Sequence, residues 1–163
     1  MRFRVVPAAY VVLRRIHQGR EQVLLQLRDG TGFMDGHWAA AAAGHVEAGE
    51  SVFDAAVREA SEELGIDVER RHLRPLCVLH RTSAPHGPVD ERVDFFFECR
   101  EWEGEPIRRE PDRSAALRWF DLTALPDPVV PHELQVLAGL QAGDVPPVAT
   151  HGFDDAVSGR AAP

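Results

Sequence analysis

The sequence predicts an α/β protein in which a mixed β-sheet packs between helices. Segments rich in β-branched residues lie before and after one strongly marked central helix, and a second helix follows late in the chain. With 163 residues, the chain suits one compact domain with a real hydrophobic core. We expect a single domain over residues 1–143 and a loose tail over residues 144–163, where prolines and glycines recur.

The first part of the chain is predicted to form strands joined by turns. Val5–Ile16 is rich in β-branched residues, and Pro7 near its start favours an edge or a bulge. A turn over residues 18–20 leads to a second predicted strand, Val23–Leu27, and then to a glycine-containing loop. The state of Ala39–Ala43 stays open, because alanine favours helix but the run is short and ends at a glycine.

The clearest helix is predicted over Ser51–Leu64. Ser51 is a good N-cap with Asp54 three residues on, and Gly65 is a natural C-cap. Apolar residues at helical spacing are expected to face the core, namely Phe53, Val57, Ala60 and Leu64. Three further strands and the late helix are predicted over Leu76–His80, Val93–Cys99, Ala115–Phe120 and Val130–Gln141.

The composition argues against several classes of function. A formal net charge of -8 disfavours a general nucleic-acid binder and an anionic membrane surface as partner. The N-terminal apolar run is too short to span a membrane, and no cleavage site follows it, so a cytoplasmic protein is expected. Cys77 and Cys99 lie in apolar runs and fit buried thiols in a reducing compartment.

Three glutamates of the central helix are predicted to share one face. With about 100° per residue, Glu59, Glu62 and Glu63 fall within an arc of about 100°, beside the apolar stripe. A solvated acidic face is the common explanation of such a run, and a cation site is the other. Like charges at this spacing repel by roughly 0.2–0.5 kcal/mol per pair, and no lysine follows at helical spacing. Mg²⁺ would relieve that repulsion, because it is a hard ion that takes carboxylate oxygens.

The segment Gly44–Ile66 resembles the Nudix box. The fixed positions of that pattern are filled by Gly44, Glu50, Arg58, Glu59, Glu62, Glu63 and Gly65, and the aliphatic positions by Ala60 and Ile66. The resemblance implies a Nudix-type α/β/α sandwich with a mixed central sheet. One departure precedes the box: family members often carry Leu-Pro-Gly or Leu-Pro-Ala there, whereas this chain has only alanines.

The resemblance also implies roles for residues of the box. Glu62 and Glu63 would be metal ligands, and Glu59 would complete the site or serve as the base. The carbonyl of Gly44 would be a further ligand, and Arg58 would hold the carboxylates in orientation. Mg²⁺, with Mn²⁺ as the alternative, would bridge diphosphate oxygens and lower the pKa of the attacking water. Such a reaction needs positioning and charge stabilisation but no covalent nucleophile.

Five candidates outside the box carry weaker signals. Glu110 lies in a stretch that resembles one in family members that cleave nucleoside triphosphates, where a glutamate reaches the metals; the alternative is a solvated loop residue. Arg28 ends the second predicted strand and either contacts phosphate or is merely exposed. Trp38 either flanks a base or packs in the core. His80 and Arg81, at a strand end, are further candidates for contact with substrate.

Three functions remain open. The compact length and the Glu110 stretch favour a pyrophosphohydrolase that converts a nucleoside or deoxynucleoside triphosphate to the monophosphate and pyrophosphate. The second possibility keeps this chemistry but acts on ADP-ribose or a nucleotide-sugar. The third is a non-catalytic Nudix ligand-binding module, which the complete box disfavours. The expected partner is a small-molecule nucleotide, with no nucleic acid and no membrane, and the chain is expected to be a monomer or a homodimer.

Overall fold

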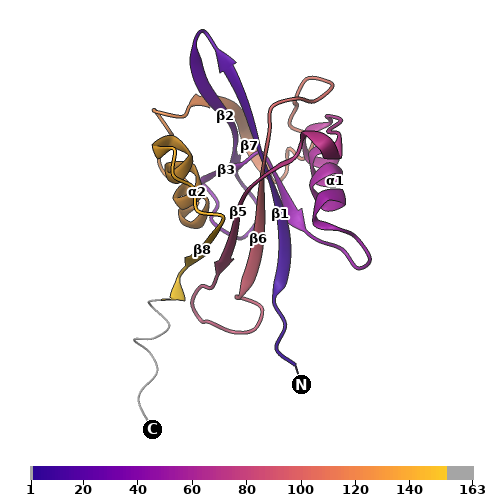
Figure 1. The fold of residues 1–163 in the computed structure, drawn as a ribbon, viewed down its shortest axis with the longest axis vertical. Coiled ribbons are helices and arrows are strands. Elements are labelled where there is room, and N and C mark those ends of the chain that lie inside the picture. Colours follow the sequence, from indigo (N-terminus) through magenta and orange to yellow (C-terminus); the bar gives the residue numbers. More distant parts are fainter. Residues whose placement is uncertain (1, 154–163) are drawn as a thin grey trace.

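The protein is described by a computed structural model that covers residues 2–153. A sheet of eight strands lies between two α-helices, which occupy opposite sides of it (Figure 1). The helices are α1 (Val52–Leu64) and α2 (Pro131–Ala142), with a short 3-10 helix, η1 (Arg70–His72). The strands are β1 (Val6–His17), β2 (Arg20–Arg28), β3 (Trp38–Ala40), β4 (Ala42–His45), β5 (Arg74–Arg81), β6 (Arg92–Cys99), β7 (Ser114–Asp121) and β8 (Val148–His151).

The sheet is mixed, as predicted. The strand order is β3-β2-β1-β6-β5-β8, with β4 paired to β1 and β7 paired to β2. β1 runs parallel to β6 and β5 parallel to β8, while the other pairs are antiparallel. The first half of β1 pairs with β4, and its end pairs with β2 through a tight turn at Gln18 and Gly19, which both have positive φ. This division brings β4 against α1.

β1 contributes to both halves of the hydrophobic core. Alternate residues of a strand point to opposite faces, so Val11 and Leu13 pack on the α1 side, and Tyr10 and Val12 pack on the α2 side. Burial on both faces explains why this strand reads as a continuous apolar run. Burying one such side chain is worth about 1.5–3 kcal/mol, so β1 is a principal anchor of the fold.

α1 begins and ends where the sequence predicts. The Ser51 hydroxyl accepts a hydrogen bond from the Asp54 backbone N–H at 3.1 Å, and Gly65 closes the helix with a left-handed φ of 66°. The predicted apolar stripe packs into the α1 side of the core. The other predicted strands and the late helix are also confirmed, with bounds at most three residues from those expected.

The alanine run, whose state the sequence left open, forms strand. Ala40 pairs with Leu25 in β2, and Ala42 pairs with Val11 in β1. Five residues are too few to nucleate a helix alone, so pairing with two longer strands outweighs the helix preference of alanine. The small side chains of this run also let α1 lie close to β4. As a result, the Glu63 carboxylate on α1 accepts a hydrogen bond from the Ala43 backbone N–H at 3.0 Å.

The predicted loose tail over residues 144–163 is wrong for its first part. Residues 148–151 form β8, which pairs with β5 through Val78↔Val148 to Arg81↔His151. Pro146 and Pro147 suggested an irregular segment, but they precede the strand and leave its own amides free to pair. A strand of four residues is too short to show a periodic pattern. Residues 154–163 of the expected tail lie outside the described residues.

Candidate active site

A pocket of about 660 Å³ extends from α1 to the start of α2. Its walls come from the first half of β1, from β3 and β4, from the ends of β5 and β6, and from the loops around residues 29–37 and 82–91. The helices α1 and α2 lie on opposite sides of the sheet (Figure 1). Residues of both helices line the pocket, which therefore reaches both faces. It has two differently charged ends, and α1 supplies the acidic one.

The carboxylate end consists of four glutamates that line the pocket: Glu59, Glu62, Glu63 and Glu110. The first three come from α1 at the predicted helical spacing, and the fourth comes from the segment before β7. The Glu59 carboxylate packs directly on Gly44, where a Cβ atom would lie 2.0 Å from Oε1. The glycine of the box is therefore required here because a carboxylate lies so close to its α-carbon.

Arg58 connects the carboxylate end to the loop before α1. Its Nε and Nη2 donate to the two carboxylate oxygens of Glu50 at 2.8 and 3.0 Å. Its Nη1 donates to Glu59 at 2.7 Å and to Glu62 at 3.2 Å, and Nη2 also reaches the His45 carbonyl at 3.1 Å. Hydrogen bonds from Arg58 hold the pKa of Glu50 at about 2, well below its usual range. One guanidinium thus fixes three carboxylates in relative orientation.

The electrostatics of this end favour a cation. Burial, together with the nearby charges of Glu59 and Glu110, raises the pKa of Glu63 to about 8 against the lowering effect of the Ala43 N–H. Burial also raises the pKa of Glu59, against the lowering effect of Arg58. A divalent ion would take the place of the proton on Glu63 and offset the repulsion among these carboxylates.

The donor set fits a hard divalent cation in kind, because it consists of carboxylate oxygens and a backbone carbonyl. Within residues 2–153, no three acidic, histidine or cysteine side chains already enclose a common point. Glu59 and Glu62 are turned toward Arg58, and Glu63 is turned toward Ala43. To bind a divalent ion, these carboxylates would have to exchange some of these hydrogen bonds for bonds to the metal.

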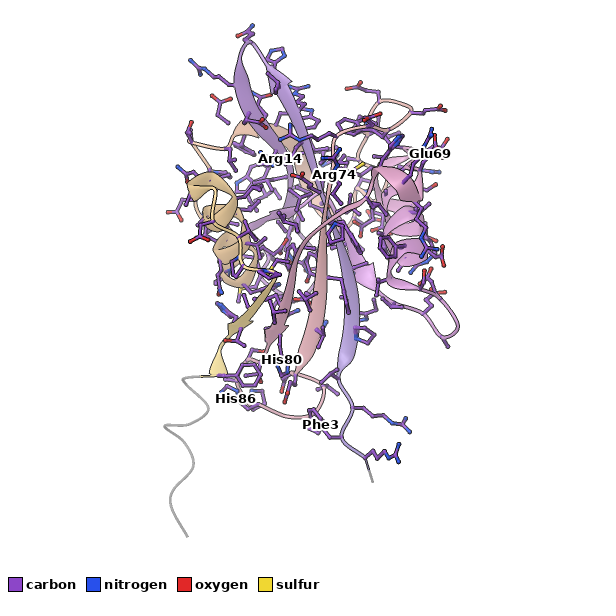
Figure 2. All side chains as sticks on the ribbon, in the orientation of Figure 1. Phe3, Arg14, Glu69, Arg74, His80 and His86 are labelled. Atoms are coloured by element: carbon purple, nitrogen blue, oxygen red, sulfur yellow. The ribbon has the colours of Figure 1, made fainter. Side chains whose placement is uncertain are left out.

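The five candidates outside the box differ in whether they line the pocket. Arg28, Arg81 and Glu110 line the pocket, whereas Trp38 and His80 do not. Trp38 packs edge-on against a neighbouring aromatic ring of β7, with ring centroids 4.7 Å apart. The His80 Nε2 lies 2.8 Å from the Glu91 carboxylate, and Figure 2 shows this side chain at the end of the sheet where β5 stops.

Strand alternation explains why His80 and Arg81 do not act as a pair. Adjacent residues of β5 point to opposite faces, and of these two only Arg81 lines the pocket. The Arg81 side chain is 6% exposed and paired with Asp94. Trp38 follows the alternative that the sequence left open, which is packing in the core.

At the other end of the pocket lies a second set of polar residues, of which sequence reasoning identified only Arg81. This polar end consists of four buried residues that line the pocket: Tyr10, Arg81, His132 and Glu133. The Tyr10 hydroxyl lies 3.3 Å from His132 Nε2, and Glu133 accepts a hydrogen bond from the Ala40 N–H at 2.7 Å. Asp94, a charged residue within the apolar run of β6, was the signal that could have pointed to it.

A conservative change at Gly44 tests the packing of the carboxylate end. Gly44→Ala is expected to lower kcat about 100-fold, because the new methyl group displaces Glu59, and a displacement of about 1 Å from productive geometry has this effect. The displaced atoms are the end of a flexible side chain, so the melting temperature is expected to change little. Steady-state kinetics and thermal denaturation check both expectations, and a large loss of stability with normal kcat would contradict the assignment.

Glu133 gives the protein a pH-dependent stability that one substitution removes. Burial raises the pKa of Glu133 from 4.5 to about 7, against the lowering effect of its bond from Ala40. As pH rises from 4.5 to 7, the unfolded chain loses this proton while the folded protein retains it, so the free energy of unfolding falls. The full loss above pH 7 is about 3 kcal/mol. Glu133→Gln is expected to be more stable than the wild type at pH 8 and similar at pH 4.5, as measured by urea denaturation. A difference independent of pH would contradict this.

A mixed sheet between two helices, one of which lines the pocket with glutamates, is an arrangement that can hold a divalent ion against a phosphate. The NUDIX domain profile matches residues 5–140, and the chain belongs to that family. The uncharacterized Nudix hydrolase YfcD of Escherichia coli (strain K12) is 30% identical to it over 145 residues, which cover 80% of this chain and 69% of the relative.

Two solved structures show the same likeness. The MutT NUDIX hydrolase from Burkholderia pseudomallei is 33% identical, with a TM-score of 0.67 over 81% of this chain and 96% of that chain. The NUDIX domain of Shewanella oneidensis NrtR, which was solved in complex with ADP ribose, is 18% identical with a TM-score of 0.66 over 86% and 87% of the two chains. The second likeness is one of fold alone.

The protein is therefore a Nudix pyrophosphohydrolase, an enzyme that cleaves phosphoric anhydride bonds in nucleoside-diphosphate-linked substrates. Nudix hydrolases generally use divalent metal ions, which agrees with the chemistry of the carboxylate end. None of the helices described between residues 2 and 153 is long and apolar enough to cross a membrane.

Proposed function

We propose that the protein is a Mg²⁺-dependent enzyme that converts a nucleoside or deoxynucleoside triphosphate and water to the monophosphate and pyrophosphate. The observation that carries this proposal is the position of Glu110. It lines the pocket beside the box glutamates, and its charge acts on both Glu59 and Glu63. A longer polyphosphate brings more negative charge and needs more divalent cation, and a carboxylate from outside the box extends the set of ligands.

The reaction assigns a role to each group at the carboxylate end. A divalent ion, when bound, would neutralise phosphate charge and lower the pKa of the attacking water. The proposed ligands are Glu59, Glu62, Glu63, Glu110 and the carbonyl oxygen of Gly44. Arg58 keeps the carboxylates in their relative orientation, and Glu59 is also the candidate base. The water oxygen bonds to phosphorus, its proton passes to the base, and the anhydride bond breaks to release pyrophosphate.

Arg28 is the proposed contact for the phosphate chain. Its side chain is already fixed, because Nε donates to the Phe33 carbonyl at 2.8 Å and Nη2 donates to the Thr31 hydroxyl at 3.0 Å. An arginine held in one geometry loses less entropy when it binds an oxyanion. Arg28 lines the pocket, so its remaining N–H donors are available there.

The experiment is a product assay over a panel of substrates. Release of pyrophosphate and of phosphate is measured with each nucleoside triphosphate, ADP-ribose and several nucleotide-sugars, in Mg²⁺ and in Mn²⁺. We expect pyrophosphate from triphosphates, with turnover abolished in Glu62→Gln. Turnover of ADP-ribose alone would keep the site but overturn the proposed substrate. Tight nucleotide binding without turnover of any compound would indicate a ligand-binding module.

A further inference from the structure

The polar end of the pocket is built from charged and polar side chains that the reaction at the carboxylate end does not use. Arg81, His132 and Glu133 are 5%, 5% and 3% exposed, and Tyr10 is 8% exposed. They come from β5, α2 and β1, on the side of the sheet opposite α1. Burying such groups is costly unless they form hydrogen bonds, so their retention at a pocket wall calls for a ligand that pairs with them.

The hydrogen-bonding capacity of this end exceeds what the protein itself uses. Arg81 donates from Nε to Asp94, which is fully buried, and lies beside the Tyr10 hydroxyl. A guanidinium has five N–H donors, and within residues 2–153 only the Nε donor of the Arg81 side chain has a hydrogen-bonding partner. Glu133 uses Oε1 for the Ala40 N–H, and within residues 2–153 its other oxygen has no hydrogen-bonding partner. A donor and an acceptor are thus left facing the same pocket.

The polar end is close to neutral, in contrast to the carboxylate end. Arg81 is balanced by Asp94. Burial lowers the pKa of His132 to about 2, so its imidazole is uncharged, and burial brings the pKa of Glu133 to about 7. The four residues themselves therefore supply little net positive charge for a phosphate, although the charges of Arg28 and Arg92 act on them from nearby. Three alanines of the pocket wall, Ala8, Ala40 and Ala43, also pack on the α2 side of the sheet, and their small side chains leave room for a flat ring.

We propose that the polar end is the nucleobase subsite of the reaction proposed above, and that it selects bases in which a keto oxygen adjoins a ring N–H. Arg81 donates to the keto oxygen, and the ionised carboxylate of Glu133 accepts from the ring N–H through its free oxygen, so the selectivity is expected above about pH 7. Guanine, uracil and thymine present this pair. Adenine and cytosine present an amino donor beside a ring-nitrogen acceptor. With these bases, the Arg81 donor would face the amino donor and the Glu133 acceptor would face the ring nitrogen.

The expected selectivity is large, because a mismatched base leaves buried polar groups without partners. Sites that hydrogen-bond a substrate group reject analogues lacking it by factors of about 10⁴–10⁵ in favourable cases. This pocket is open at one side, so we expect GTP and UTP to exceed ATP and CTP by about 100-fold in kcat/KM. The expected difference in kcat/KM rests on the proposed function, because it requires triphosphate turnover. The expected base preference in nucleotide binding does not.

The test uses Glu133→Gln, which retains an amide oxygen for the Ala40 N–H and replaces the free acceptor with an N–H donor. We expect the preference for keto bases to fall at least about tenfold, mainly through KM. Glu105→Gln removes one exposed carboxylate outside the pocket and is the matched control. An equal loss with all four bases would make Glu133 a structural residue and overturn the proposal.

Binding of nucleoside monophosphates without metal separates this inference from the proposed function. Calorimetry with GMP, UMP and AMP is expected to show tighter binding of the first two to the wild type and no difference in Glu133→Gln. That preference without triphosphate turnover would leave the subsite standing and overturn the proposed function. Triphosphate turnover that is indifferent to the base, or hydrolysis of ADP-ribose with tight AMP binding, would overturn the subsite.

Discussion

Replacement of Arg58 by alanine is expected to lower kcat about 1000-fold, because the loss of a preorganised electrostatic group at a phosphate-cleaving site has effects of this size. The guanidinium holds Glu50 through two hydrogen bonds and also reaches Glu59 and Glu62. Without it, these carboxylates repel one another and lose their common orientation. Single-turnover kinetics at saturating Mg²⁺ measures the effect on the chemical step.

Arg58→Lys separates charge from geometry. A lysine keeps the positive charge but is a point donor, and it cannot span the two oxygens of Glu50 while contacting the other carboxylates. We therefore expect Arg58→Lys to recover only a small part of the lost rate. If lysine restores nearly full activity, the role of Arg58 is charge alone, and the inferred orienting function is wrong.

Replacement of Glu63 by glutamine is expected to reduce kcat at least about 1000-fold while the fold persists. Glutamine has the same shape and can still accept the hydrogen bond that Ala43 donates to this position. It cannot supply the carboxylate oxygen that a divalent ion takes. Mg²⁺ is expected to raise the melting temperature of the wild type, since a ligand that binds only the folded state stabilises it.

The same titration in Glu63→Gln is expected to show a much smaller shift in melting temperature at equal Mg²⁺ concentration. Glu105→Gln, which removes an exposed carboxylate that does not line the pocket, should respond like the wild type. Equal Mg²⁺ shifts in all three proteins would mean that the ion does not bind at the carboxylate end.

The local parts of the fold and site could be predicted from the sequence, because their causes are local. Helical spacing places Glu59, Glu62 and Glu63 on one face, and Ser51 and Gly65 mark the ends of the helix that carries them. Strand periodicity predicted most of the sheet but not its pairing. Mixed pairing also explains why the alanine run could not be assigned, since its strand state depends on β1 and β2.

The polar end of the pocket could not be predicted, because it is assembled from distant segments. Tyr10 and His132 are 122 positions apart in sequence but in contact in the fold. Glu133 reads as an ordinary acidic residue in the first turn of a helix, where it complements the helix dipole. Its burial is decided by the docking of α2 on the sheet, which no local pattern encodes. His80 and Arg81 were both predicted from residue type and their place at a strand end, without regard to which face of β5 each occupies.

β8 also protects one edge of the sheet against pairing with another chain. An edge strand presents a row of unpaired amides and carbonyls that can template addition of another chain, and proteins guard such edges with short covering strands. β8 covers β5 in this way, yet it lies at residues 148–151, beyond the span 5–140 that matches the family. The catalytic machinery and the protection of the sheet against self-association are thus encoded in separate stretches of the chain. A fragment chosen to match the family would retain the carboxylate end but leave β5 open to aggregation.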